Sequence, residues 1–457
     1  MSANDGRVPV GGEGRPGPAG DDDRGAAGAP ARPGSDAGDV RARAAEDQAR
    51  AAEDHLGPAP IGGAAEPADG RVPGDAGGRR PHDGDGRLPG DPGGRASAGA
   101  KGCLDPLAAL RTPDEPAWDV YLTGTVFLDI IFTGLDSAPV RGTESWARGM
   151  GQSPGGVANM ATALARLGLR TSLAAAFGDD HYGSYCWDAL EQGEGIDLAQ
   201  SRTVPGWHSP VTVSMAYEGE RTMVSHGHDA PPVEPAPECP PRSRAAIASL
   251  APGVREEWVA QAAAKGTMIF ADVGWDDTGR WDLAGLADLA HCEAFLPNAE
   301  EAMRYTGTDC PRAAARALTA HVPLAVVTLG AEGAYAVDGR TGETAEVPAI
   351  AVEALDPTGA GDVFVAGFVT GTLAGWPLAD RLAFAGLTAA LSVQEFGGSL
   401  SAPGWAEIGA WWRRIQSYED QDPSALRRYA FLEGLVPESS RPWPLRRAVP
   451  TIGFGQR

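Results

Sequence analysis

Beyond residue 118 the chain alternates short apolar runs with longer stretches in which apolar residues recur at helical spacing. The runs predicted to form strands include Val120–Leu122, Phe127–Phe132, Thr267–Phe270 and Leu324–Leu329. The stretches predicted to form helices include Val157–Leu167, Glu256–Lys265, Pro311–Ala320 and Gly361–Leu373. Alternation of this kind favours an α/β fold, in which a central, mostly parallel sheet carries helices on both faces.

One segment departs from this rhythm. Val211–Tyr217 and Arg221–Ser225 flank Glu218-Gly219-Glu220, a pattern that predicts a β-hairpin. A hairpin inserted into a doubly wound domain is a candidate lid. We therefore expect a small β lid formed by segments near 126–150 and 208–228.

The first hundred residues differ in composition from the rest. They contain no Phe, Trp or Tyr but hold 23 of the 62 glycines. Such a segment cannot bury enough apolar surface to offset the entropy lost on ordering. We expect a disordered tail rich in Gly, Pro, Ala, Arg and Asp over 1–115, one ordered domain over 116–436, and a C-terminal tail over 437–457. A translation start further downstream would remove the first tail, and both alternatives stay open.

The charge excludes some partners. The net charge is −23, and about −18 of it falls beyond the first hundred residues. Such an acidic surface repels nucleic acid and anionic lipid, so we expect neither as a partner. The five cysteines are scattered without a Cys-x-x-Cys pair, and no secretory signal is evident, so we expect a cytoplasmic protein. The uncharged run 363–379 contains Gly and Pro and predicts a buried helix, not a membrane span.

The strongest chemical signal is Asp356-Pro357-Thr358-Gly359-Ala360-Gly361-Asp362, followed at once by an apolar run. The small residues open a predicted helix, whose first amides and positive end would hold an anionic oxygen without any lysine. Asp362 falls in the first turn, where its carboxylate would reach a substrate hydroxyl. An anion site beside a carboxylate base suits phosphoryl transfer, whereas the structural alternative is an ordinary helix N-cap.

This stretch resembles the C-terminal signature of the PfkB (ribokinase-like) carbohydrate kinase family. Other stretches resemble further family elements in the family's order. They are Gly124–Asp129, Gly155–Asn159, Gly178–Gly183, Asp272–Trp275, Asn298–Glu301 and Thr328–Gly333. The resemblance spans roughly 119–404, which is nearly the whole predicted domain, and implies a ribokinase-like α/β fold.

The resemblance implies ATP-dependent phosphorylation of a hydroxyl on a sugar or sugar-like molecule. Asp362 would be the base, and the amides of Gly359, Ala360 and Gly361 would stabilise the transferring phosphoryl group. The residues expected to bind the acceptor are Asp129, Gly155, Gly156 and Asn159. Those expected at the nucleotide are Thr328, Gly330 and Gly333. Asn298 and Glu301 are expected in the outer shell of Mg²⁺. Asp356 and Thr358 are expected at a monovalent cation such as K⁺.

Several of these residues also have ordinary structural interpretations. Gly155 and Gly156 would equally form a turn before a helix, and Asn159 would cap that helix. Asn298 and Glu301 lie one helical turn apart and so share a face, as they also would at a solvated helix start. Asp129 is also compatible with a strand-end residue that makes only local hydrogen bonds.

The acceptor is less well defined than the reaction. The family usually has one more residue between Gly-Gly and Asn, and its phosphosugar kinases tend to carry Lys where this chain has Val157, so an unphosphorylated acceptor is expected. An adenosine-type nucleoside kinase is the alternative enzyme. A catalytically silent ligand-binding relative that uses the lid for partner recognition is another alternative, and the lid also offers a surface for a homodimer.

Two other patterns are set aside. His226-Gly227-His228-Asp229 resembles a metal cluster, but it follows the hairpin and lacks a second ligand group at a defined spacing. We interpret it as part of a loop or lid. A Walker A sequence is absent and the only lysines are Lys101 and Lys265, which excludes the P-loop NTPase mechanism.

Overall fold

The computed structural model describes residues 108–112, 114–217, 220–230, 240–276, 278–417 and 423–436, all within the unit that runs from Pro92 to Arg457. The predicted C-terminal tail and residues 1–107 of the predicted N-terminal tail lie outside the described residues. A 3-10 turn occupies Ala108–Leu110, and Arg111 donates a hydrogen bond to Asp119. The described structure thus begins slightly before the predicted domain boundary at 116.

A sheet of eight strands forms the centre of the domain, in the order β14-β13-β12-β11-β10-β9-β1-β4. The strands are β1 (Trp118–Thr123), β4 (Thr171–Ala174), β9 (Ser243–Leu250), β10 (Met268–Val273), β11 (Ala294–Phe295), β12 (Leu324–Thr328), β13 (Ala334–Asp338) and β14 (Thr344–Val347). From β4 to β12 neighbouring strands run parallel, and β13 and β14 are added antiparallel. The predicted mostly parallel sheet is confirmed.

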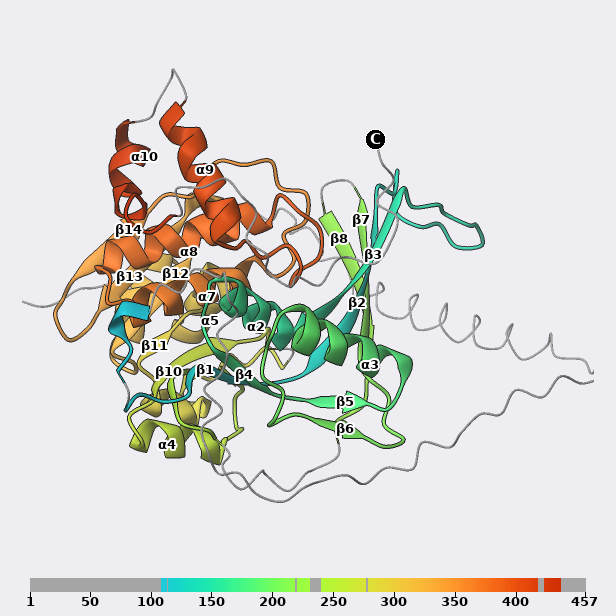
Figure 1. The fold of residues 1–457 in the computed structure, drawn as a ribbon, viewed down its shortest axis with the longest axis horizontal. Helices are drawn as coiled ribbons and strands as arrows, with labels where there is room; N and C mark the ends of the chain where they lie inside the picture. The colour runs from blue at the N-terminus through green and yellow to red at the C-terminus, as the bar shows by residue number, and fades with distance from the viewer. Residues whose placement is uncertain are drawn as a thin grey trace, which may run out of the picture. The chain divides into compact units, whose positions relative to one another are not determined.

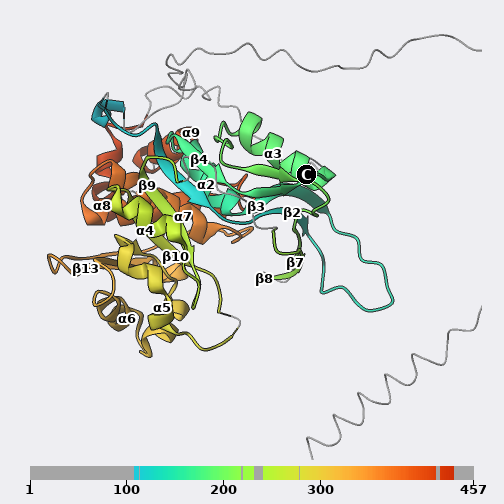
Figure 2. The same cartoon turned by 90° about the horizontal axis from the view of Figure 1, so that it is seen from below.

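Helices cover both faces of this sheet (Figures 1 and 2). On one face lie α2 (Val157–Arg166), α7 (Ala360–Leu373), α8 (Leu378–Ser392) and α9 (Trp405–Ser417). On the other lie α4 (Glu257–Ala264), α5 (Ala299–Thr306) and α6 (Pro311–Leu318). The remaining helices are α3 (His181–Asp188), which contacts β2 and β5, and α10 (Pro423–Arg428). Two separate apolar cores result, as expected for a sheet covered on both sides.

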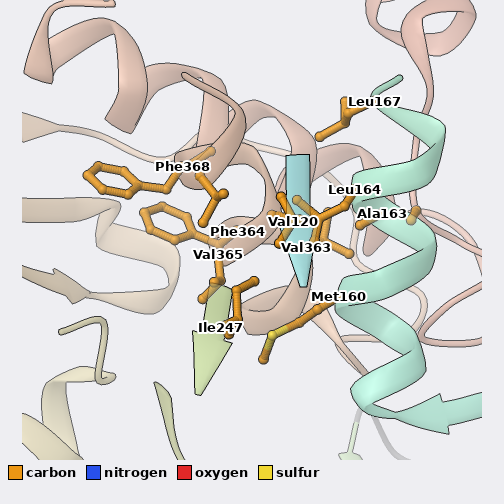
Figure 3. Packing of buried hydrophobic residues seen from close by; sticks show 14 of the residues in the cluster. Val120, Met160, Ala163, Leu164, Leu167, Ile247, Val363, Phe364, Val365 and Phe368 are labelled. Carbon is orange, nitrogen blue, oxygen red and sulfur yellow. The ribbon is translucent and has the colours of Figure 1, made fainter. Parts of the chain in front are cut away.

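Side chains of successive residues on a strand enter opposite cores. In β1, Val120 and Leu122 pack with the α2 and α7 side, whereas Tyr121 packs with the α4 side. Figure 3 shows Val120 and Ile247 of the sheet beside Met160 of α2 and Val363 of α7. This packing fixes the N-terminal turns of α2 and α7 next to each other above the sheet.

The lid is a second sheet of four strands, in the order β3-β2-β7-β8. Its strands are β2 (Val126–Thr133), β3 (Gly149–Gly156), β7 (Val211–Tyr217) and β8 (Glu220–His226). The predicted hairpin is present as β7 and β8. The lid strands lie to the right of the central sheet in Figures 1 and 2, with the two-stranded pair β5 (Ala176–Gly178) and β6 (Arg202–Val204) on the same side.

β3 was not expected from the pattern. Its sequence, Gly-Met-Gly-Gln-Ser-Pro-Gly-Gly, has no β-branched residue, yet all eight positions pair antiparallel with β2. Gly155 and Gly156, interpreted from the sequence as a turn, are the last two residues of this strand, and the chain passes directly from them into α2.

Arg166 ties α2 to two other segments, through a buried ion pair with Glu194 in the turn after α3 and through hydrogen bonds to the segment that follows α8. The side chains of Arg166 and Glu194 are 3% and 2% exposed and lie 2.7 Å apart. Arg166 also donates from Nη1 to the carbonyls of Leu400 and Ala402.

Among the described residues, no helix has both the length and the apolar character required to cross a lipid bilayer.

Candidate active site

The start of α7 leaves backbone amides free, as the predicted anion site requires. Gly359 precedes the helix in the left-handed conformation, at φ 74°, which favours glycine. The amides of Gly359 and Gly361 have no bonding partner among the described residues, and a side chain at Gly361 would meet nothing within 4 Å. The amide of Ala360 donates to the Pro357 carbonyl at 3.3 Å, so this predicted donor is partly engaged. The free amides lie at the positive end of the helix, where an anion is stabilised.

Asp362 lies in the first turn of α7, beside Asn159 of α2. Asn159 donates from Nδ2 to Oδ2 of Asp362 at 2.9 Å, although the two residues are 203 positions apart. The Asn159 side chain is 5% exposed and its Oδ1 has no partner. Burial raises the pKa of Asp362 to about 6, which suits a carboxylate that must accept a proton near neutral pH.

Asp129 lies on β2, close enough to Asp356 and Asp362 for their charges to affect it. It is 8% exposed, and its pKa is raised to about 7, first by burial and then by the negative charges of Asp356 and Asp362. The strand opposite leaves room for this carboxylate because Gly155 has no side chain. A Cβ built at Gly155 would lie 2.0 Å from Oδ2 of Asp129. The predicted base and the predicted acceptor carboxylate are thus brought together.

The predicted nucleotide residues lie at the carboxyl end of β12. Thr328 ends the strand and pairs with Asn298 in an isolated parallel bridge. Gly330 and Gly333 have positive φ values of 58° and 113°. A Cβ at Gly333 would lie 2.0 Å from the carbonyl oxygen of Val347, so glycine is required there by the backbone alone. Their contact with a nucleotide stays a prediction.

Asn298 and Glu301 form a capping box at the start of α5. The Asn298 side chain accepts from the Glu301 amide, and the Glu301 carboxylate accepts from the Asn298 amide. These bonds show why the helix begins here, whatever else the pair does. Burial raises the pKa of Glu301 and, more strongly, that of Asp272 at the end of β10.

These acidic groups suit a divalent cation held partly by a nucleotide. The charges of Asp362 and Glu301 add to burial in raising the pKa of Asp272, so an added positive charge would relieve that repulsion. Among the described residues, no group of three or more His, Cys, Asp or Glu side chains is arranged to hold a metal ion. Phosphate oxygens and water would therefore supply the remaining ligands of Mg²⁺.

The Asp356 carboxylate organises the segment before α7. Its Oδ1 accepts from the amide and hydroxyl of Thr358, and its Oδ2 accepts from the amide of Gly397. Arg221 of β8 lies 3.9 Å from Oδ1. A monovalent cation at Asp356 and Thr358 stays a prediction, since these oxygens already have several protein donors.

Three residues of the site were missed as site residues. The sequence identifies Asp272 only as the acidic end of a strand. The two carboxylates that interact with it, Glu301 and Asp362, are remote in sequence. Gly398 lies against Asn159, where a Cβ would come 2.7 Å from Oδ1. Arg221 lies in the predicted hairpin, and the sequence contains no pattern that predicts its hydrogen bond to Thr358.

The histidine-rich stretch lines a cavity next to β2. The rings of His226 and His228 are 5.0 Å apart at nearly perpendicular planes. Both line a cavity of about 400 Å³, together with Phe127, Trp207 and Ser225. Phe127 lies two residues from Asp129 on the same face of β2, so the cavity is bounded by the strand that carries Asp129.

A mostly parallel central sheet with helices on both faces, a mixed four-stranded lid and a carboxylate at a glycine-lined helix start together define a ribokinase-like domain. The model of the pfkB family carbohydrate kinases matches residues 123–405. The chain belongs to this family, so the resemblance noted in the sequence is confirmed.

Individual relatives agree with this assignment. The chain is 28% identical to the ribokinase of Haemophilus influenzae, over 54% of its own length and 82% of that protein. It is 32% identical to the fructokinase of Klebsiella pneumoniae, over 51% of its own length and 80% of that protein. It is 36% identical to the ribokinase of Schizosaccharomyces pombe, but over only 26% of its own length and 40% of that protein.

Solved structures share the fold. Arabidopsis thaliana ribokinase, solved with ribose and ATP, has a TM-score of 0.54 and 25% identity, with 64% of this chain and 96% of that chain covered. A Burkholderia thailandensis nucleoside kinase, solved with inosine, has a TM-score of 0.51 and 22% identity, with 66% and 100% covered. At this identity the second match indicates the fold alone. The predicted ribokinase-like fold is confirmed.

The raised pKa of Asp362 predicts an acid limb in the pH profile of activity. As the pH falls through about 6, Asp362 gains a proton and can no longer accept one from a hydroxyl. We expect kcat/KM to fall about tenfold per pH unit below that value. Measuring kcat/KM between pH 5 and 9 tests this, with the thermal midpoint followed in parallel to exclude unfolding. A profile that is flat down to pH 5 would contradict the assignment of the base.

Proposed function

We propose that this protein is an ATP-dependent kinase that transfers the γ-phosphoryl group to a hydroxyl of a sugar or sugar-like molecule. The observation that carries the proposal is the position of Asp362. It lies in the first turn of a helix at which the amides of Gly359 and Gly361 are free among the described residues, and its charge raises the pKa of the buried Asp129 carboxylate. A base and an anion site so placed are the two protein components that phosphoryl transfer requires.

In the proposed reaction, the acceptor hydroxyl loses its proton to Asp362 while its oxygen forms a bond to the γ-phosphorus. The bond between that phosphorus and the β–γ bridging oxygen breaks, and ADP leaves. The amides of Gly359 and Gly361, with a weaker contribution from Ala360, stabilise the charge on the transferring group. Asn159 holds Asp362 in place through its 2.9 Å hydrogen bond.

The remaining predicted residues are assigned to binding. Asp129 accepts hydrogen bonds from acceptor hydroxyls, and Gly155 and Gly156 let the acceptor approach the backbone. The nucleotide lies near Thr328, Gly330 and Gly333. When bound, Mg²⁺ would neutralise phosphate charge, with Asn298, Glu301 and Asp272 near it. A K⁺-type ion at Asp356 and Thr358 is part of the proposal and is tested by replacing K⁺ with tetramethylammonium.

The acceptor is proposed to be unphosphorylated, because Val157 follows the Gly-Gly pair where a cation would meet a phosphate. A nucleoside is the second candidate, favoured by the 400 Å³ cavity beside Phe127 and Trp207, whose aromatic lining suits a planar base. A catalytically silent ligand-binding relative is the third. A cytoplasmic location and a homodimer through the lid also stay proposals.

An acceptor screen separates these alternatives. ADP release is coupled to NADH oxidation and measured with ribose, fructose, a sugar acid, adenosine, cytidine and inosine. Turnover with a sugar or sugar acid supports the first proposal, and turnover with a nucleoside alone supports the second. If nothing is phosphorylated while ATP still binds by calorimetry, the silent relative is the correct alternative.

A further inference from the structure

The lid strand β8 carries an arginine, Arg221, that contacts the segment before α7. Laterally paired residues on neighbouring strands of a sheet project from the same face, and so do residues two apart along a strand. Arg221 pairs with Ala216 and thus shares a face with Thr212, which in turn pairs with Asp129. The guanidinium therefore lies on the face of the lid that carries the acceptor carboxylate.

The Arg221 side chain connects the lid to the residues Asp356 and Thr358 before α7. Its Nη1 donates to the hydroxyl of Thr358 at 2.8 Å and lies 3.9 Å from Oδ1 of Asp356. The residue is 30% exposed, so this contact is only partly screened by water. Thr358 directly precedes Gly359, whose free amide belongs to the anion site.

The contact between Arg221 and Thr358 matters because three carboxylates lie near it. Asp129, Asp356 and Asp362 interact closely enough that the last two raise the pKa of the first, while Arg221 lowers it. The lid thus brings a guanidinium to a group of three carboxylates.

We propose that Arg221 is the positioning residue through which the lid, once in contact with the 356–359 segment, holds the anion site in its working geometry. It acts through Thr358. Losing that contact frees the turn before Gly359, so its amides no longer meet the transferring phosphoryl group in the correct position. A displacement of about 1 Å near reacting groups can cost 10²-fold in rate. This inference rests on the proposed kinase function.

A double-mutant cycle tests this role. Arg221→Gln and Thr358→Val are each expected to lower kcat by about 10-fold to 10²-fold, with the Kd for ATP changed less than about twofold. Because both remove the same contact, the double variant should be no slower than the slower single variant. Thr358→Ser keeps the hydroxyl and should retain most of the activity, and added guanidinium chloride should partly restore Arg221→Gln.

The matched control is Arg141→Gln, at an exposed arginine in the loop between β2 and β3 that makes no hydrogen bond or ion pair with the described residues, and this variant should behave like the wild type. Thermal midpoints within about 2 °C of the wild type exclude unfolding as the cause. The inference is overturned if Arg221→Gln keeps the wild-type kcat, or if the two single losses multiply in the double variant. A wild type that phosphorylates nothing in the acceptor screen instead contradicts the proposed function, so the two failures are distinguishable.

Discussion

Asp362→Asn is expected to lower kcat by at least ~10²-fold, the usual size of the loss when a general base is removed. Asparagine keeps the shape of the side chain and can still accept the hydrogen bond from Nδ2 of Asn159, so the N-terminal turn of α7 should be preserved. It cannot take up the proton of the attacking hydroxyl. The KM for the acceptor and the Kd for ATP should therefore change little.

Steady-state kinetics with the acceptor found in the screen measures this effect. Asp309→Asn is a suitable control, because that aspartate is exposed between α5 and α6 and forms no hydrogen bond or ion pair with any described residue. A kcat for Asp362→Asn within threefold of the wild type would show that another group accepts the proton, and the proposed mechanism would then have to be abandoned.

The second large effect is expected from Gly155→Ala, which adds one methyl group to β3. The new Cβ would come 2.0 Å from Oδ2 and 2.3 Å from Cγ of Asp129, so the carboxylate must move. Because Asp129 is proposed to bind acceptor hydroxyls, its displacement should lower kcat/KM for the acceptor by up to ~10²-fold. The affinity for ATP should stay close to the wild-type value.

The matched control for this change is Gly386→Ala in α8, where the added Cβ meets nothing within 4 Å. Alanine has the higher helix propensity, so this variant should be fully active and at least as stable as the wild type. If Gly155→Ala phosphorylates the acceptor with an unchanged KM, Asp129 does not contact the acceptor.

The sequence predicts the central sheet well because its strands are apolar runs separated by helical stretches. It fails at β3, whose glycines and proline are typical of a loop. That strand forms because β2 offers it a complete antiparallel partner, and Gly155 is needed so that Asp129 fits. A propensity scale contains neither requirement.

The site shows the same division between local and long-range information. The segment from Asp356 to Asp362 is contiguous, so its chemistry is visible in one stretch of sequence. Asp272 and Arg221 belong to strands far from it in the chain, and only the register of two sheets reveals which face each side chain occupies. Conversely, the capping box of Asn298 and Glu301 explains their spacing without any ligand.

The lid is built from two stretches of chain, β2–β3 and β7–β8, that are separate from the one forming the start of α7. Under the proposed function, mutations that accumulate at lid positions other than Arg221 can alter which alcohol is accepted, while the segment from Asp356 to Asp362 is inherited unchanged. Such modularity gives evolution a route to new substrates by gradual change at one edge of the protein. It offers a physical reason why relatives named for ribose, fructose and cytidine are all similar to a single chain.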